Sequence, residues 1–290
     1  MPSIIVLDTL SPDGIALLDA AAEVGITYEI TTGLSGESLR ETLARHDGAI
    51  CRSGVKITAE SLAGNHRLKA IVRAGVGTDN IDKESATRQG IVVMNTPAGN
   101  TVSTAEHAFA LLLGLSRNIA TADASLRDHR WDRSKLMGVQ LAGKTIGIVG
   151  LGRIGLAVAK RARAFDMRVI GFDPFLSPDR AAELGVELFD SVRGMLPQVD
   201  YLTVHTPLTA DTQHLIGMNE LPLLKPGVRL VNCARGGIYD EKALFVGLTS
   251  GVIAGVALDV FEKEPCTESP LFGLPGVLVT PHLGASTEEA

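Results

Sequence analysis

The chain has 290 residues, of which 45% are hydrophobic and only 4% aromatic, and its formal net charge is −6. This length allows two medium-sized domains, and the aliphatic composition with 31 glycines favours parallel strands covered by helices over an antiparallel sandwich. No block of basic residues supplies the positive surface that nucleic acid or an anionic membrane requires, so we expect a small-molecule partner.

Cysteine usage and hydropathy both favour a cytoplasmic location. Cys51, Cys233 and Cys266 are far apart, without CxxC spacing, so neither a disulfide framework nor a metal site is expected. The N-terminus lacks a basic leader, and the longest apolar run, "AFALLLGL" at 108–115, is too short to cross a bilayer.

The first hundred residues alternate short apolar runs with amphipathic segments. Ser11 is expected to cap a helix that begins at Pro12. Strands are predicted at 4–7, 48–51, 68–72 and 91–95, each followed by turn residues and a helical pattern. The pattern predicts one open parallel sheet, forming a first domain over residues 1–97.

The second domain, residues 98–290, is predicted to begin with one long connector helix at about 101–125, the helix-period run "TVSTAEHAFALLLGLSRNIATADAS". Strands are then expected at 144–150, 167–173, 199–205, 228–234, 253–260 and 277–281, with a helix from Asp240. Six strands interleaved with helices are typical of a doubly wound, dinucleotide-binding sheet, and the fold class is therefore α/β with two parallel sheets.

The segment "GLGRIG" follows the first strand of this domain and opens a helix. Gly150 permits a tight turn, Gly152 lets the backbone approach a pyrophosphate, and Gly155 allows close packing of helix on strand. Asp173 ends the next strand, where its carboxylate suits the ribose hydroxyls and repels a 2′-phosphate, so NAD is predicted over NADP. Alternatively, Asp173 only caps the turn before Pro174.

These motifs together, "GLGRIG", "GFDP", "HTPLT", "VNCARGG", "ALDVFEKEP" and "TPHLGAST", resemble the D-isomer-specific 2-hydroxyacid dehydrogenase family, and most closely its branch that acts on D-3-phosphoglycerate. The first half agrees through "CRSGVKIT", "RAGVGTDNID" and "NTPAGNTVSTAEHA". The resemblance covers the catalytic core of that branch, and it implies a flavodoxin-like substrate domain followed by a Rossmann NAD-binding domain.

The resemblance also implies a catalytic triad of Arg235, Glu264 and His282. A planar guanidinium holds a substrate carboxylate bidentately. An imidazole is suited to accept the hydroxyl proton near neutral pH, and a carboxylate on its other nitrogen fixes the tautomer. Taken singly, each of the three is more often a surface charge or a core histidine. His205, also at a strand end, has no acid–base role in the family.

The remaining site residues come from the same resemblance. Cofactor contacts are expected from Val76, Gly150, Gly152, Arg153, Ile154, Gly155, Asp173, Thr206, Cys233, Ala234, Arg235, Asp259, His282, Gly284 and Ala285. Substrate contacts are expected from Arg52, Ser53, Gly54, Arg73, Gly77, Asn100, Arg133 and Arg235. Backbone N–H groups of "RSGV" and "AGVG" would form anion-holding nests, whereas Arg133 or the nearby Lys135 is equally well explained as a solvated loop charge.

The function implied is NAD-dependent oxidation of D-3-phosphoglycerate to 3-phosphohydroxypyruvate, the first step of L-serine biosynthesis. Two alternatives stay open: reduction of glyoxylate, hydroxypyruvate or another small 2-oxoacid, and an NAD-sensing corepressor-type module. Trp131 and the helix before it resemble the family's dimer contact, so a homodimer or homotetramer is expected.

The family continues past "HLGASTEEA" with a helix that returns to the first domain. The resemblance therefore leads us to expect a shortened chain that keeps His282 but lacks this helix.

Overall fold

The computed structural model describes residues 1–290 and divides into two compact units, Met1–Asn100 and Thr101–Ala290. The predicted boundary between residues 97 and 98 falls close to this division. The units are described separately below. None of their helices combines the length and apolar character that crossing a membrane would require.

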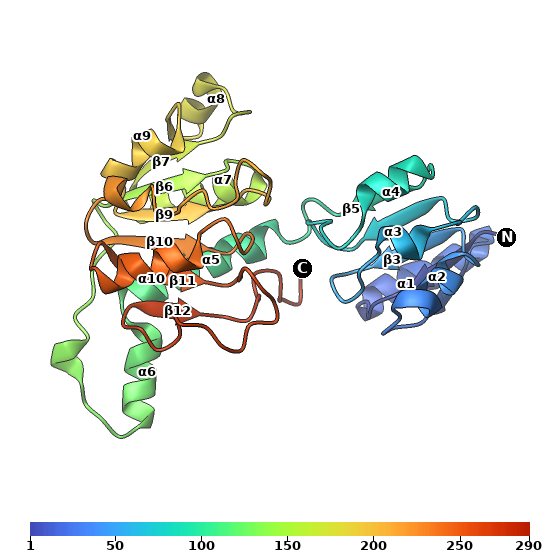
Figure 1. Ribbon diagram of the computed structural model, residues 1–290, viewed down its shortest axis with the longest axis horizontal. Coiled ribbons are helices and arrows are strands. Elements are labelled where there is room, and N and C mark those ends of the chain that lie inside the picture. Colours follow the sequence, from blue (N-terminus) through green and yellow to red (C-terminus); the bar gives the residue numbers. More distant parts are fainter. The chain divides into compact units, whose positions relative to one another are not determined.

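The first unit is a parallel five-stranded sheet in the order β2-β1-β3-β4-β5 (Figure 1). This is the flavodoxin-like order, in which the chain reverses direction across the sheet between β1 and β3. The strands are β1 (Ser3–Val6), β2 (Thr27–Ile30), β3 (Gly48–Cys51), β4 (Ala70–Arg73) and β5 (Val92–Asn95). The helices are α1 (Pro12–Ala21), α2 (Gly36–Leu43), α3 (Ala59–Leu62) and α4 (Lys83–Arg88), with a 3-10 turn at Ala22–Val24.

The cap predicted for the first helix is confirmed. The Ser11 hydroxyl accepts a hydrogen bond from the Gly14 N–H at 3.2 Å, and Pro12 occupies the first helical turn. A serine in this position satisfies one of the N–H groups that a helix leaves without an internal acceptor.

The second unit is a parallel seven-stranded sheet in the order β12-β11-β10-β9-β6-β7-β8 (Figure 1). The strands are β6 (Thr145–Val149), β7 (Arg168–Phe172), β8 (Glu187–Leu188), β9 (Tyr201–Val204), β10 (Val228–Asn232), β11 (Ile253–Leu258) and β12 (Val277–Val279). The helices are α5 (Thr101–Ser116), α6 (Ile119–Arg127), α7 (Arg153–Ala164), α8 (Pro178–Glu183), α9 (Val192–Met195) and α10 (Glu241–Thr249); 3-10 turns lie at Arg133–Lys135, Leu196–Gln198 and Leu221–Leu223. The chain reverses direction between β6 and β9, as in a Rossmann fold.

Two strands lie outside the sequence predictions. β2 is an exposed edge strand of mixed polarity, and β8 is only two residues long and also lies at an edge. Neither has the continuous apolar run that marks a strand buried on both faces, so hydrophobic patterning alone does not reveal them.

The prediction of one connector helix over residues 101–125 is wrong: the run forms two helices. α5 ends at Ser116, whose carbonyl accepts the Val139 N–H at 2.9 Å, and α6 begins at Ile119. Asn118 between them has φ 54°, in the left-handed region that asparagine tolerates better than most residues. As a result α6 leaves the direction of α5 and projects from the body of the second unit (Figure 1).

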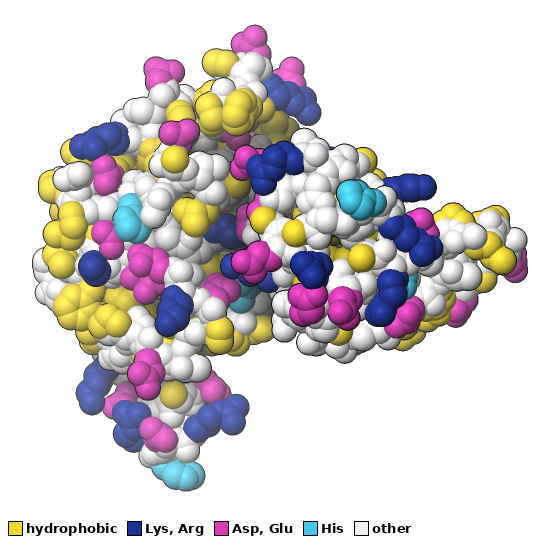
Figure 2. Space-filling view, turned by 45° about the vertical axis from the view of Figure 1, so that its right-hand side comes forward, with side chains coloured by type: hydrophobic (Ala, Val, Ile, Leu, Met, Phe, Trp, Pro, Cys, Tyr) yellow, Lys and Arg dark blue, Asp and Glu magenta, His cyan; other side chains and the backbone are white.

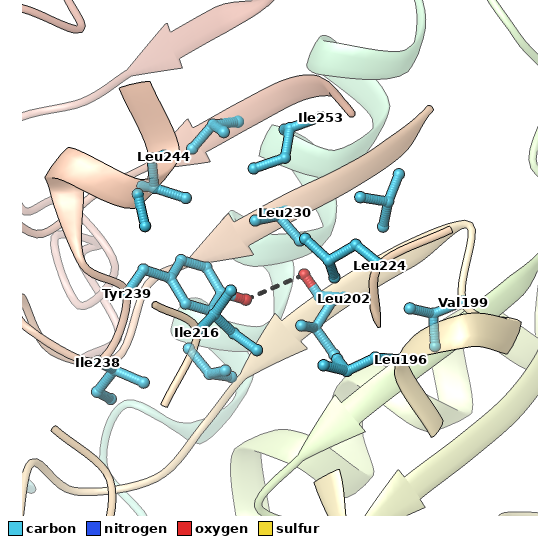
Figure 3. Packing of buried hydrophobic residues seen from close by; sticks show 14 of the residues in the cluster. Leu196, Val199, Leu202, Ile216, Leu224, Leu230, Ile238, Tyr239, Leu244 and Ile253 are labelled. Atoms are coloured by element: carbon cyan, nitrogen blue, oxygen red, sulfur yellow. Dashed lines mark hydrogen bonds between the residues drawn. The ribbon is translucent and has the colours of Figure 1, made fainter. Parts of the chain in front are cut away.

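The core beside β9 and β10 surrounds the fully buried Tyr239 (Figure 3). Its hydroxyl donates toward the carbonyl oxygens of Leu202 and Val231, at 3.3 and 3.2 Å. Burial raises the pKa of Tyr239 well above its ordinary value, so the ring stays neutral. Its partners in the cluster include Leu196, Val199, Ile216, Leu224, Leu230, Ile238, Leu244 and Ile253. This packing fixes the central strands whose carboxyl ends carry the candidate site.

Candidate active site

The three predicted catalytic residues follow three neighbouring parallel strands. Arg235 follows β10, Glu264 follows β11 and His282 follows β12, and these strands are adjacent in the sheet. Parallel strands place their carboxyl ends on one edge, where ligands bind in open α/β sheets. The topology therefore puts all three residues on the same edge of the second unit.

Glu264 and His282 form a hydrogen-bonded pair. The Glu264 Oε2 atom lies 2.7 Å from His282 Nδ1, and its Oε1 accepts the Phe261 N–H at 3.1 Å. A carboxylate only accepts, so the proton is assigned to Nδ1 and the Nε2 lone pair is left to act as a base. The His282 side chain is 51% exposed, which leaves Nε2 accessible to a substrate.

Arg235 is positioned by Asn232, a residue that the sequence reasoning missed. The Asn232 side chain donates to the Arg235 carbonyl at 2.8 Å and accepts the Ala234 N–H at 2.9 Å. Arg235 Nη1 also donates to the Ala234 carbonyl at 2.6 Å. A buried asparagine ending the apolar strand "VRLVN" was the signal available in the sequence, because buried amides need partners.

The loops after β10 and β11 touch through backbone atoms. A Cβ atom on Gly236 would overlap the carbonyl oxygen of Phe261. Only glycine permits this approach, which fixes the segment carrying Arg235 against the segment carrying Glu264.

The glycine-rich turn after β6 packs against the end of β9, the strand next to β6 at the point where the sheet reverses direction. Gly150 has φ 87°, and a Cβ atom there would lie 2.7 Å from the His205 carbonyl oxygen at the end of β9. A Cβ on Gly155 would overlap the Gly150 carbonyl oxygen, whereas nothing lies within 4 Å of a Cβ on Gly152. The space beside Gly152, at the N-terminus of α7, is therefore open.

The surroundings of this turn fit a dinucleotide. No side chain caps the N-terminus of α7 and its first turn has no acidic residue, so its N–H groups are available to a pyrophosphate. Arg153 is exposed there. The Thr206 hydroxyl is buried without a hydrogen-bond partner, an unsatisfied donor that a ligand would complete. Ile154, half-buried, packs against the apolar core below.

Asp173 lies where the sequence placed it, and it also braces the turn. Its Oδ2 accepts the Leu151 N–H and its Oδ1 the Phe175 N–H, both at 2.8 Å. The alternative role as a turn cap is therefore present. Each oxygen keeps a second lone pair, so the predicted contact with the ribose hydroxyls remains open to it.

Asp259 is fully buried at the end of β11 and binds the loop that carries His282. Its Oδ1 accepts from the Thr280 hydroxyl and the Leu283 N–H, at 2.6 and 2.7 Å, and Oδ2 accepts the Gly284 N–H at 2.8 Å. Burial alone would raise the pKa of Asp259, but hydrogen bonds from His107, Thr280 and Leu283 lower it below its usual value. Its carboxylate is therefore ionised and largely committed to the protein; Ala285 follows in the same loop.

Two clusters bring three potential metal ligands within 4.8 Å of one another: His107 with Cys233 and Asp259, and His214 with Asp240 and Glu262. In both clusters the carboxylates already accept hydrogen bonds. Asp259 accepts those described above, and Asp240 and Glu262 accept from N–H groups in the first turn of α10. Burial and the nearby Asp259 raise the pKa of the Cys233 thiol well above its ordinary value, which disfavours the thiolate that a metal requires. Both clusters are explained as hydrogen-bond networks.

The predicted substrate residues of the first unit gather at the carboxyl edge of its own sheet. Arg52, Ser53 and Gly54 follow β3, Arg73 is the last residue of β4 and Gly77 follows this strand, and Asn100 follows β5; Val76, predicted to contact the cofactor, lies next to Gly77. Asn95 donates to the Val76 carbonyl at 2.6 Å, and Asn80 donates to the Arg52 and Val55 carbonyls at 2.7 and 2.8 Å. Side-chain amides thus hold both predicted nests in shape.

One donor of the first nest is already used, and by a residue that the sequence reasoning missed. The Arg52 N–H donates to Asp8 Oδ2 at 2.5 Å, and a Cβ on Gly54 would overlap the same carboxylate. Asp8 follows β1, next to the reversal point of the sheet, where ligands bind in open α/β sheets. An anion at this nest would have to rely on the remaining N–H groups and on side-chain cations.

Arg133 is not brought to either strand edge. It is exposed in the segment after α6, which projects from the second unit (Figure 1). On the face drawn in Figure 2, acidic and basic side chains are interspersed rather than gathered by sign. Within this chain the structure favours the solvated-charge explanation for Arg133, and its contact with substrate stays a prediction.

His205 makes the stability of the second unit depend on pH. Burial lowers its pKa from 6.5 to about 4, and its Nδ1 has no hydrogen-bond partner. The unfolded chain therefore takes up a proton between pH 6.5 and about 4 that the folded chain refuses, so stability falls as the pH is lowered through this window. We expect a loss of about 3 kcal/mol from this group.

Urea unfolding followed by near-UV circular dichroism would measure this loss, because two of the three tyrosines, Tyr201 and Tyr239, are buried in the same unit. His205→Gln keeps a donor toward the Thr203 hydroxyl, which lies 3.0 Å from Nε2, and it removes the titration. An unchanged pH dependence in this variant would contradict the assignment.

The fold and this edge of polar residues define the class of NAD-binding α/β dehydrogenases. Residues 109–284 match the NAD-binding domain of the D-isomer specific 2-hydroxyacid dehydrogenases, and the chain belongs to this family. NAD is accordingly the cofactor of its second unit.

Curated relatives and solved structures agree. The chain is 47% identical over 290 residues to the D-3-phosphoglycerate dehydrogenase of Methanocaldococcus jannaschii, covering 100% of this chain and 55% of the relative. It is 46% identical over 289 residues to that of Bacillus subtilis, covering 99% and 54%. The chain thus spans about half the length of the curated relatives it matches. A glyoxylate reductase structure from Paecilomyes thermophila superposes with a TM-score of 0.90 at 32% identity, covering 99% of this chain and 90% of that one.

Proposed function

We propose that this chain is the catalytic core of an enzyme that oxidises D-3-phosphoglycerate to 3-phosphohydroxypyruvate with NAD, the entry reaction of L-serine biosynthesis. The observation that carries the proposal is the His282–Glu264 pair, 2.7 Å apart, at the strand edge that also bears Arg235 and the glycine-rich turn. The identity to D-3-phosphoglycerate dehydrogenases over the whole chain supports this substrate in particular.

The roles of the residues follow from their chemistry. Arg235 binds the substrate carboxylate through paired N–H groups, which orients the hydroxyl-bearing carbon C2. His282 Nε2 accepts the hydroxyl proton as the C2–H bond breaks, and Glu264 stabilises the resulting imidazolium through Nδ1–H. The nicotinamide of bound NAD supplies the acceptor for the hydride that leaves C2. In the reverse direction His282 returns the proton to the carbonyl oxygen.

Residues of this chain would also bind the cofactor. The N–H groups at Gly152 and Arg153 would bind the pyrophosphate, Thr206 would contribute its hydroxyl, and Asp173 would accept hydrogen bonds from the ribose. For the substrate's phosphate, Arg52 and Arg73 are the cations that the first unit offers at its strand edge. In a protein of net charge −6, such local cations are needed to hold a phosphorylated acid.

The test is a steady-state assay of the purified chain with NAD and D-3-phosphoglycerate, following NADH. We expect turnover, with kcat/KM higher for this substrate than for glyoxylate or hydroxypyruvate assayed in the reducing direction. A preference for glyoxylate would replace the substrate by the one that the Paecilomyes relative is named for. NAD binding without turnover on any of these acids would instead support the cofactor-sensing module. An assembly into dimers or tetramers, also proposed, is measured by light scattering.

A further inference from the structure

His282 sits in a strained backbone conformation, because its φ is 56°. A non-glycine residue in the left-handed region is disfavoured and persists only where its surroundings hold it there. Residues on both sides of His282 bind the same carboxylate: the Thr280 hydroxyl before it, and the Leu283 and Gly284 N–H groups after it, donate to Asp259.

The fourth donor to this carboxylate comes from α5. His107 Nε2 lies 3.1 Å from Asp259 Oδ1 and 3.1 Å from the Thr280 hydroxyl oxygen. A carboxylate only accepts, so Nε2 is assigned the proton and its N–H is shared between the two oxygens. The imidazole is mostly buried, with 21% of the side chain exposed, and Asp259 is fully buried. His107 therefore links α5 to Asp259 and to Thr280, the carboxylate and one of the donors that hold the loop of His282.

We propose that His107 is a positioning residue for the proposed reaction: through Asp259 and Thr280 it holds the 280–284 loop so that His282 keeps its left-handed backbone and its imidazole stays aligned on Glu264. We call these three side chains, His107, Asp259 and Thr280, the loop clamp. The inference rests on the proposed function for its kinetic consequence, but the clamp itself is a property of the folded protein.

The decisive measurement needs no substrate. Hydrogen–deuterium exchange with mass spectrometry, on peptides covering 280–286, reports the Leu283 and Gly284 N–H groups directly. His107→Leu removes the shared donor, and we expect exchange in these peptides to become about fivefold faster, as for one lost hydrogen bond. His107→Gln places an amide N–H near the position of Nε2, and we expect it to restore slow exchange.

The kinetic arm separates positioning from a merely structural tether. In His107→Leu we expect kcat to fall about five- to tenfold with the KM for NAD changed less than about twofold, because a misaligned base slows the chemistry without weakening nucleotide binding. His107→Gln should recover most of kcat. Glu106→Gln is the matched control: it removes the ion pair of the neighbouring α5 residue with Arg161, 2.7 Å long, and leaves the clamp intact.

The outcomes are distinct. Exchange in 280–286 that is unchanged in His107→Leu overturns the proposal. Because that variant could loosen the whole unit, Thr280→Val, which removes another clamp donor with little change of shape, is measured alongside it. Faster exchange in both variants confined to 280–286, with β11 peptides unchanged, supports the clamp; equal acceleration in β11 overturns it. Absence of turnover in the unmodified protein would refute the proposed function alone and leave the exchange result decisive for the clamp.

Discussion

His282→Ala is expected to lower kcat by roughly 10²–10⁴-fold, the contribution typical of a positioned general base. The substitution removes the only group in the Glu264 pair that can accept the hydroxyl proton, since Glu264 itself lies behind the ring at Nδ1. NAD affinity should fall far less than kcat, because His282 is only one of the expected cofactor contacts and the glycine-rich turn and Asp173 are untouched. Steady-state kinetics with D-3-phosphoglycerate, together with an NAD titration, measure both quantities.

His214→Ala provides the matched control. His214 also has a positive φ, 49°, lies in the same unit and has a glutamate nearby, with Nε2 3.5 Å from Glu262 Oε1. Unlike His282, it has no role beside Arg235 and Glu264 in the proposed reaction. Loss of kcat in both variants to the same extent would show that damage to a left-handed histidine, and not removal of the base, explains the effect.

Gly155→Ala is expected to destabilise the second unit by about 3 kcal/mol, at the upper end of the cost of overpacking, because the new Cβ would overlap a backbone carbonyl that has no rotamer to escape into. For a unit of this size the melting temperature should drop by roughly 6–12 °C. NAD binding should weaken as well, since the turn at Gly150 must shift. Thermal unfolding and an NAD titration follow the two effects.

Gly152→Ala is the control, and we expect it to leave stability unchanged while weakening NAD binding. A Cβ there meets nothing within 4 Å, and φ −70° suits any residue, so stability should stay within about 0.5 kcal/mol of the unmodified protein. The methyl group nevertheless projects where the pyrophosphate must approach the α7 N–H groups, so the Kd for NAD should rise about tenfold or more. Equal stability losses in the two variants would contradict this division of roles.

Sequence patterns predicted the elements whose signal is local. The buried strands β6, β9, β10 and β11 are apolar runs ended by turn residues, and the glycine spacing marks one specific backbone turn. The break at Asn118 was missed because a helical period continues across it. The left-handed Asn118 is stabilised by a contact from elsewhere in the chain, since its side chain donates to the Met137 carbonyl at 3.3 Å.

The candidate site shows the same division between residues that local motifs indicate and residues whose roles depend on tertiary contacts. The family motifs indicated Arg235, Glu264 and His282, and the structure brings Glu264 and His282 into contact. Asp8 and His107 were missed because each acts on a segment distant in sequence, so its role depends on the tertiary neighbour. Asn232 binds residues only two and three positions away, so its buried amide at a strand end was a local signal that the sequence reasoning did not use. Asp259, expected to contact the cofactor, binds the loop of His282 in the structure.

The acid–base pair, its brace at Phe261 and the clamp that steadies it all belong to the seven-stranded unit. In the proposed reaction, the groups that move the proton are therefore all placed by the folding of one unit. The residues that we propose for the rest of the substrate lie in loops of the five-stranded unit, and these loops have their own hydrogen-bonded supports. Substitutions in those loops are therefore expected to alter substrate preference without disturbing the hydrogen bonds that hold His282 in place.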